Sequence, residues 1–219
     1  MSTTANQKAS KQRDIIVHAA QQFAQNGYHE TKIQDVATAA DIGKGTVYEY
    51  FRTKEELFLG VYDLWMSEYE EMILKRVGEQ SDALGKVDAI RNSAIEFYES
   101  RAEQAPLFLE FWAHALRTDN PAFLERINKT RTMLRTMGAD LAQQLVDAGW
   151  FTDLDAATFA LLETGINDGI FLAWTLEGRS FPLKKAYTFR QSLIGLGLLS
   201  DDARVALKGK LSEKLKQGI

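Results

Sequence analysis

The sequence contains no cysteine, which excludes a disulfide scaffold, a thiolate metal site and a cysteine nucleophile. Its first ten residues are polar and lack the apolar core of a signal peptide. No apolar run approaches the roughly 18 residues that a membrane-spanning helix needs. We therefore expect a cytoplasmic protein that has no metal site, no cofactor and no membrane partner.

Proline is scarce as well, and the three prolines lie where helices can begin. The apolar–polar alternation of strands is missing, and apolar residues recur at helical spacing along almost the whole chain. This pattern predicts an all-α fold. The glycines at 27, 149 and 178 lie where helices are expected to end. Helices are expected near residues 11–25, 32–39, 44–50, 54–77, 86–104, 107–117, 121–148, 154–177, 183–199 and 202–216.

The formal net charge of the 219 residues is −4, which by itself disfavours a nucleic-acid partner. The placement of charge matters more than its sum. Up to Lys54 the chain is slightly basic, and the negative excess lies in the remainder. Composition therefore permits DNA binding by the N-terminal segment without predicting it.

The span from Thr31 to Leu57 carries the most specific pattern. It predicts a short helix with Thr31 as its cap, a tight turn, a second short helix, and a longer helix capped by Thr53. Two short helices joined by such a turn form a helix-turn-helix unit, whose second helix has the size to enter the major groove of DNA. The second helix is expected to anchor the unit through its apolar side, with Val47 and Phe51 packed on Ile16, Ala20, Phe23 and Val36.

At these positions the sequence resembles the TetR family of transcriptional regulators. The family pattern has a threonine, an aliphatic residue followed by alanine, a turn, lysine-glycine-threonine, an aliphatic residue, tyrosine, any residue, an aromatic and phenylalanine. The turn departs from the pattern, since it commonly reads glycine, aliphatic, serine and here reads Asp41-Ile42-Gly43. The resemblance covers about residues 10–60, and the matching residues are Thr31, Val36, Ala37, Ala40, Lys44, Gly45, Thr46, Val47, Tyr48, Tyr50, Phe51, Lys54, Glu55, Glu56 and Leu57.

The resemblance implies a three-helix DNA-binding domain over residues 1–56, joined by a long helix to a helical effector-binding and dimerisation domain over residues 57–219. Residues near helix N-termini are expected to hold phosphates, and those along the second short helix to face the DNA. The alternative is that an isolated lysine is simply solvated and an isolated tyrosine half-buried. The DNA-binding candidates are Thr31, Lys32, Lys44, Gly45, Thr46, Tyr48, Tyr50 and Lys54.

The second part of the chain is rich in aromatic residues with a few polar neighbours. Such residues can line a pocket for a small apolar or aromatic effector, although aromatics at helical spacing usually form core. The effector-binding candidates are Phe108, Phe111, Trp112, His114, Trp150, Glu163, Asn167, Phe171 and Trp174.

Two helices near the C-terminus carry an apolar stripe interrupted by small residues. Two such helices from each subunit would form a four-helix bundle, which favours a homodimer. The alternative is that the stripe is internal core. The interface candidates are Phe159, Leu162, Ile166, Gly169, Ile170, Ala173, Leu193, Ile194, Leu196, Gly197 and Leu198.

The sequence thus predicts a ligand-responsive repressor that binds a near-palindromic operator in double-stranded DNA as a homodimer and releases it when a small molecule binds. An enzyme is a weaker hypothesis, because no nucleophile elbow, phosphate-binding loop or paired metal-ligand spacing is present. A helical small-molecule-binding or scaffolding protein is the second alternative. Such a protein would not need the motif between Lys44 and Phe51.

Overall fold

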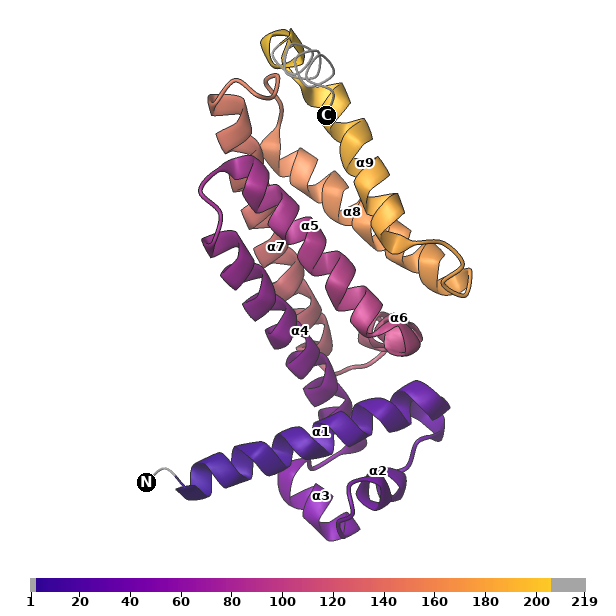
Figure 1. Cartoon of the computed structure of the whole chain (residues 1–219). Coiled ribbons are helices and arrows are strands. Elements are labelled where there is room, and N and C mark those ends of the chain that lie inside the picture. Colours follow the sequence, from indigo (N-terminus) through magenta and orange to yellow (C-terminus); the bar gives the residue numbers. More distant parts are fainter. Residues whose placement is uncertain (1–2, 206–219) are drawn as a thin grey trace, which may run out of the picture. The chain divides into compact units, whose positions relative to one another are not determined.

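The computed structural model describes residues 3–205, with side chains from Asn6 onward, and its regular elements there are helices (Figure 1). The all-α prediction is confirmed. Of the helix predicted at 202–216, residues 201–205 are helical and the remainder lies outside the described residues. The elements are α1 (Thr3–Glu30), α2 (Ile33–Ala39), α3 (Lys44–Tyr50), α4 (Lys54–Gly78), α5 (Ala83–Ser100), the 3-10 helix η1 (Ala102–Gln104), α6 (Ala105–Ala115), α7 (Pro121–Asp147), α8 (Ala156–Leu176) and α9 (Leu183–Leu198).

Helix starts follow local capping chemistry. The hydroxyl of Thr53 accepts a hydrogen bond from the backbone N–H of Glu56 at 3.0 Å, as predicted for the start of α4. The Glu56 carboxylate in turn accepts from the N–H of Arg52 at 2.7 Å. Asp155 caps α8 by accepting from the N–H groups of Ala157 and Thr158. These bonds satisfy N–H groups that have no partner within a helix.

Helix ends follow one recurrent motif. At the end of α7, Gly149 has φ 74° and its N–H donates to the carbonyl of Val146, while the N–H of Trp150 donates to that of Leu145. This is the Schellman motif, which needs a residue in the left-handed region and usually takes glycine. Gly178 has φ 63° after α8, and Gly27 has φ 76° inside α1, where regular helical geometry is interrupted. The helix ends predicted at Gly149 and Gly178 are therefore confirmed, whereas Gly27 marks a break after which α1 continues to Glu30.

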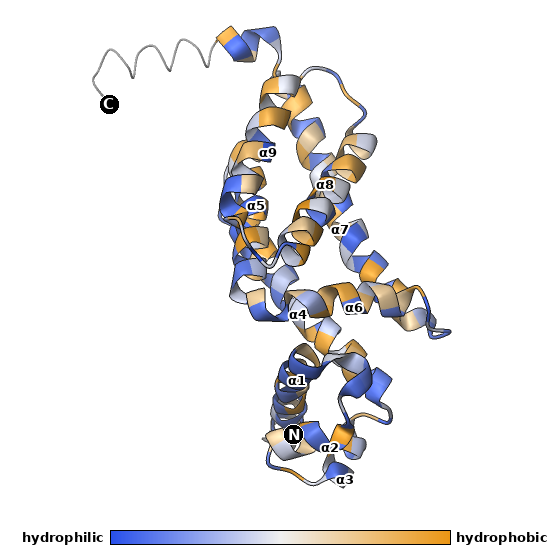
Figure 2. Ribbon diagram, turned by 90° about the vertical axis from the view of Figure 1, so that its right-hand side faces the viewer, coloured by the Kyte–Doolittle hydropathy of each residue, from blue (hydrophilic) through white to orange (hydrophobic). Residues whose placement is uncertain are grey.

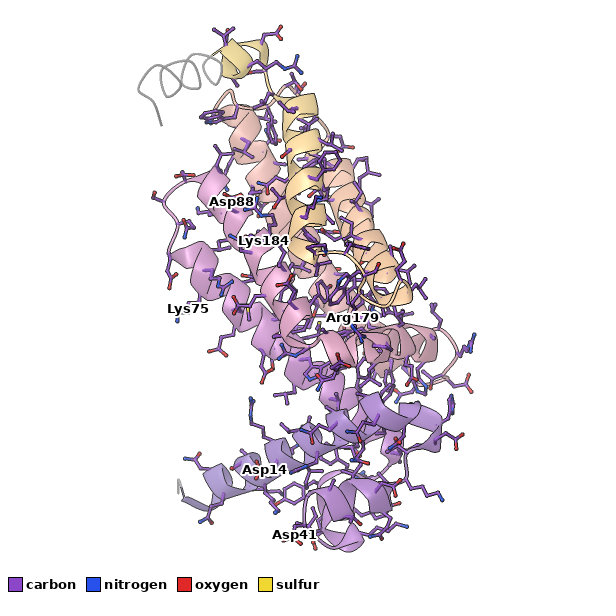
Figure 3. All side chains as sticks on the ribbon, turned by 45° about the vertical axis from the view of Figure 1, so that its right-hand side comes forward. Asp14, Asp41, Lys75, Asp88, Arg179 and Lys184 are labelled. Atoms are coloured by element: carbon purple, nitrogen blue, oxygen red, sulfur yellow. The ribbon has the colours of Figure 1, made fainter. Side chains whose placement is uncertain are left out.

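Asp41 occupies the same special position after α2. Its φ is 50°, its N–H donates to the carbonyl of Thr38, and the N–H of Ile42 donates to that of Ala37. The departure from the family's turn pattern thus places a side chain where glycine is preferred. Asp41 is exposed, at the outer edge of the unit where Figure 3 labels it.

The described residues fall into two compact units. The first contains residues 3–71 and 100–129, and the second contains residues 72–99 and 130–205. The first unit is larger than the predicted DNA-binding domain over 1–56, because it includes α6, most of α4 and the beginning of α7. The boundary at residue 56 itself stays a prediction.

The core of the first unit forms between α1 and the helix-turn-helix. α1 packs against α2 and α6, and α2 packs against α3. Val47 and Phe51 are buried, as predicted, and so are the residues proposed as their anchor. Burial of these apolar side chains fixes the inner face of α3 and leaves its outer face without such contacts. The anchor residues are Ile16, Ala20, Phe23 and Val36.

The second unit contains α5, α8, α9 and the longer part of α7, and α8 packs against α9. Figure 2 colours both α6 and α8 mainly as hydrophobic. α6 buries its apolar side chains in the first unit, whereas α8 leaves Leu161, Leu162 and Leu176 exposed. Each helix within residues 3–205 is too short or too polar for a membrane span.

We expect Asp41→Gly to raise the free energy of unfolding by roughly 0.5 kcal/mol, since relief of left-handed strain exceeds the added entropy of the unfolded chain. Gly149→Ala is the matched control, because Gly149 occupies the same motif and a Cβ there meets no atom within 4 Å. It should lower the free energy of unfolding by about 1 kcal/mol. Urea titration followed by circular dichroism measures both. A less stable Asp41→Gly variant would show that the aspartate side chain stabilises the turn.

Candidate nucleic-acid interface

α3 presents one face to the core and the opposite face to solvent. Val47 is fully buried, and at 100° per residue Gly45 and Glu49 lie almost opposite it. Both are exposed. Lys44 and Tyr48 lie on one flank, where the Lys44 ammonium is 5.9 Å from the centre of the Tyr48 ring. The exposed face of α3 therefore offers a cation, a phenol, a bare backbone position and one carboxylate.

Half of the DNA-binding candidates are exposed. Lys32, Lys44, Gly45 and Tyr48 are exposed, and Tyr48 is 45% accessible although it is a large aromatic residue. Thr46 and Tyr50 are half-buried on the side of α3 away from Tyr48. A Cβ at Gly45 would meet no atom within 4 Å, so nothing inside the first unit requires glycine there. The bare backbone of Gly45 is available for close approach by an external molecule.

Thr31 requires a correction. Its side chain is only 1% exposed, and its hydroxyl lies 2.7 Å from the carbonyl of Gly27 and 3.1 Å from that of Gln22. It neither caps α2 nor faces solvent, because Lys32 occupies the N-cap position of α2. The Thr31 hydroxyl instead donates its proton to backbone carbonyls before and at the break in α1, with Gly27 as the nearer acceptor. We therefore withdraw Thr31 as a side-chain contact to phosphate.

Lys54 is also engaged within the unit. Its ammonium donates to the carbonyls of Tyr28, His29 and Thr31 at 2.8, 3.0 and 3.1 Å, and it lies 4.6 Å from the centre of the Tyr28 ring. An ammonium has three protons, so these three carbonyls use its full donor capacity. The predicted phosphate contact through the Lys54 side chain is replaced by a structural role: it fixes the α1–α2 connection to the start of α4.

Glu55, the next residue, binds the opposite side of the unit. Its carboxylate accepts hydrogen bonds from the Thr118 hydroxyl at 2.7 Å and the Asn120 amide at 3.2 Å, and lies 2.9 Å from His114 Nε2. These contacts, with that from Thr118 the strongest, hold the pKa of the Glu55 carboxyl below its usual range, although burial acts in the opposite direction. Glu55 thereby joins the start of α4 to α6 and the α6–α7 loop.

Two further carboxylates brace the first unit. Glu110 of α6 accepts a hydrogen bond from the backbone N–H of Tyr28 at 2.9 Å. Glu68 of α4 pairs with Arg13 of α1 at 2.5 Å and also binds Arg101. Arg13 is thus held by Glu68. These carboxylates connect α1 to α4 and α6.

The effector candidates divide between the two units. Those on α6 belong to the first unit, where Phe111 stacks on Phe58 at 4.2 Å and Phe108 packs on Trp65 at 4.7 Å. His114 contacts Glu55 and the rings of Tyr28, Phe58 and Phe123. Because Phe108, Phe111 and His114 attach α6 to α1, α4 and α7, we no longer propose them as effector contacts. Trp112, which is half-buried, stays a prediction.

The other effector candidates lie in the second unit, where the predicted Glu163 and Asn167 form a polar cluster with Arg190, a residue that the sequence did not indicate. Arg190 of α9 donates to Glu163 and Asn167 of α8 at 2.8 and 2.7 Å. Burial raises the pKa of Glu163 even though Arg190 opposes the shift. The Glu163 Oε1 and Arg190 Nε atoms are buried without a hydrogen-bond partner. Beside Trp174, Phe171 is fully buried, and Trp150 is half-buried in the α7–α8 loop.

A second ion pair lies beside the aromatic residues of the same unit. Arg131 of α7 pairs with Asp168 of α8 at 2.6 Å. The Tyr98 ring of α5 stacks on Phe171 at 4.3 Å, and burial raises the pKa of the Tyr98 hydroxyl. Arg131, Arg190 and Tyr98 are separated in sequence by many helical turns, so only the packing of α5, α7, α8 and α9 reveals that they accompany the predicted Glu163, Asn167 and Phe171.

None of the dimer candidates is fully buried in the single chain. Leu162, Ile166 and Leu193 are 60%, 41% and 57% exposed. A Cβ at Gly169 or Gly197 would meet no atom within 4 Å, so these glycines leave open surface. The exposed candidates are Leu162, Ile166, Gly169, Leu193, Leu196 and Gly197, and the half-buried ones are Phe159, Ile170, Ala173, Ile194 and Leu198.

Comparison with known families identifies both parts of the chain. Residues 15–61 match the model of the bacterial regulatory proteins of the tetR family, and residues 85–194 match the C-terminal part of BetI-type transcriptional repressors. The chain belongs to the TetR family of bacterial transcriptional regulators. The resemblance inferred from the motif is thereby confirmed, and its relatives are regulators of transcription.

Individual relatives in this TetR family extend the comparison. The repressor KstR2 of Mycobacterium tuberculosis is 26% identical over 160 residues, which cover 71% of this chain and 76% of KstR2. The fatty acid metabolism regulator protein of Bacillus subtilis is 31% identical over 81 residues, which cover 37% of this chain and 42% of that protein. The structure of FadR from Bacillus subtilis with stearoyl-CoA superposes with a TM-score of 0.73 at 20% identity, covering 85% of this chain and 98% of FadR.

We expect Glu55→Gln to lower the free energy of unfolding at pH 7 by about 1–3 kcal/mol, because three contacts to a carboxylate are weakened. The folded-state pKa of Glu55 lies below the ordinary value of 4.5 for a glutamate. The carboxylate therefore stabilises the fold above pH 4.5, and this contribution is lost as the pH falls through the folded-state value.

Urea titrations between pH 7 and pH 3 test this, with the exposed Glu79→Gln as a matched control. The Glu55→Gln variant should lose less stability on acidification than the wild type or the control. Parallel curves for all three proteins would contradict the role given to the Glu55 carboxylate.

Proposed function

We propose that this protein is a ligand-responsive repressor that binds a near-palindromic operator as a homodimer and leaves it when a small effector binds. The observation that carries the proposal is the exposed face of α3, where Lys44, Gly45 and Tyr48 are accessible while Val47 anchors the helix. Phosphate contacts from such groups position a recognition helix, and contacts to base edges select the sequence.

Dimerisation through α8 and α9 is supported by their exposed apolar stripe. Leu162 and Ile166 on α8 and Leu193 and Leu196 on α9 repeat at helical spacing, and Gly169 allows close approach. Pairing of these surfaces forms a four-helix bundle and removes the apolar area from water. A two-fold dimer then presents two α3 helices roughly 34 Å apart, which matches a near-palindromic target.

The effector is proposed to bind in the second unit, near α8 and α9. The buried Glu163 Oε1 and Arg190 Nε atoms lack hydrogen-bond partners, and buried polar atoms ordinarily have them. Phe171 and Trp174 are buried apolar residues on the same helix as Glu163 and Asn167. A small, mostly apolar molecule with one polar group suits such surroundings. FadR was solved with stearoyl-CoA, whose acyl chain is long and apolar, and this supports a ligand with an apolar part.

An effector must bind one conformation more tightly than the other to change DNA affinity. α4 and α7 each begin in the first unit and continue into the second, so a shift of either helix reaches both units through the backbone. The start of α4 carries Lys54 and Glu55, which hold the α1–α2 connection and α6. Movement there changes how α3 is presented.

We expect Lys44→Ala to weaken binding to duplex DNA from upstream of the protein's own gene and to reduce the slope of log affinity against log salt by about 1. Tyr48→Ala should weaken binding at every salt concentration. Fluorescence anisotropy at stated salt concentrations measures both. Lys75→Ala is the matched control, since Lys75 is an exposed lysine near the end of α4. Equal affinity in all four proteins, or no binding by the folded wild type to this DNA or to duplexes selected from random sequence, would favour a helical scaffolding protein.

We expect Leu193→Glu to convert the dimer into a monomer at micromolar concentration, because two-fold symmetry buries the new carboxylate twice in the same interface. Leu74→Glu is the matched control, since Leu74 is 56% exposed, close to the 57% of Leu193, but lies on α4. Sedimentation velocity separates the two species. A Leu193→Glu protein that remains dimeric would place the interface elsewhere.

A further inference from the structure

The recognition helix carries one acidic residue on the face turned furthest from the core. Glu49 lies two residues after the fully buried Val47, which places its side chain about 200° around the helix. Glu49 is exposed, and within the described part of the chain no hydrogen bond or ion pair engages it. Its carboxylate is therefore available to an external partner.

The neighbours of Glu49 leave it unshielded. Gly45 precedes it by one turn and has no side chain, and a Cβ there would meet nothing within 4 Å. The nearby cation Lys44 lies over the Tyr48 ring on the flank of the helix. Whatever approaches the outer face of α3 therefore meets the Glu49 carboxylate directly, with the bare backbone of Gly45 beside it.

A carboxylate in this place opposes binding to DNA in general. Phosphates supply most of the sequence-independent affinity, and a negative charge beside them reduces it. In the major groove, however, a carboxylate accepts a hydrogen bond from the N4 amino group of cytosine, whereas N7 and O6 of guanine offer it only acceptors. The same carboxylate thus lowers the affinity for other sequences and raises the affinity for a site with cytosine at one position.

We propose that Glu49 is a specificity-determining residue that reads a cytosine in each half-site of the operator. The proposal rests on the DNA-binding function proposed above and adds the base that is read and the residue that reads it. Lys44 and Tyr48 supply affinity, and Glu49 converts part of that affinity into discrimination.

The test is selection from random duplexes, followed by anisotropy on the selected site with each of the four bases at every position. The wild type should prefer cytosine at one position of each half-site by about tenfold or more. Glu49→Gln should move that preference to adenine, because an amide binds N6 and N7 of adenine. Glu49→Ala should remove the preference and raise affinity for unrelated DNA by about two- to fivefold at low salt. Glu99→Gln, a change at another exposed glutamate, should behave as the wild type.

Two results overturn the proposal, and they are distinguishable. In the first, the wild type selects a site, and both Glu49 variants select the same bases with unchanged affinity for unrelated DNA. Glu49 then contacts no base, while the proposed function as a DNA-binding regulator is retained. In the second, the folded wild type selects no sequence, which contradicts both the proposed function and the role of Glu49. Circular dichroism of each variant shows that the exposed substitution leaves the helices intact, so a changed preference reports on recognition.

Discussion

The placement of the helix-turn-helix depends on the start of α4, where two adjacent residues of opposite charge bind opposite sides of the first unit. The Lys54 ammonium holds three carbonyls at the α1–α2 connection, and the Glu55 carboxylate holds three groups on α6 and the loop after it. A lysine that donates to three carbonyls and a carboxylate with three polar partners are well-satisfied hydrogen-bonding arrangements, which partial burial makes stronger than in water. Because α4 begins directly after α3, these contacts determine how α3 is presented.

The sequence predicted the helices well because their signals are local. Apolar spacing located each helix, Thr53 marked the start of α4, and Gly149 and Gly178 marked two helix ends. The phosphate contacts predicted for Thr31 and Lys54 meet a physical objection, because both side chains already donate to backbone carbonyls. Both residue types bind phosphate readily, but the carbonyls that occupy them belong to residues near the break in α1 at Gly27 and the connection that follows. A pattern along the chain does not show which acceptors will compete for a donor.

Contacts between residues far apart in the sequence could not be predicted from local patterns. The contact between Glu110 and the backbone of Tyr28 joins positions 82 residues apart, and it places α6 with the DNA-binding helices. The aromatic residues of α6 therefore pack Tyr28 and Phe58, although their composition suggested a pocket in the second part of the chain. Likewise, the pairing of Arg190 with Glu163 arises only when α9 packs on α8. Sequence patterns reveal buried faces, and the packing of helices decides which of those faces meet.

The chemistry of the α6 attachment bears on how a signal can reach DNA. Its apolar part, the stack of Phe111 on Phe58, tolerates small rotations with little change in buried area, whereas the hydrogen bonds to Glu55 demand short distances and defined directions. A displacement of α6 by a fraction of an ångström therefore weakens the polar contacts before the aromatic ones. Glu55 and Lys54 are consecutive residues. A displacement of the Glu55 backbone therefore also moves Lys54, which orders the α1–α2 connection. Any ligand that displaces the start of α4 thus changes both sets of contacts, and it does so only through a difference in its affinity for the two positions.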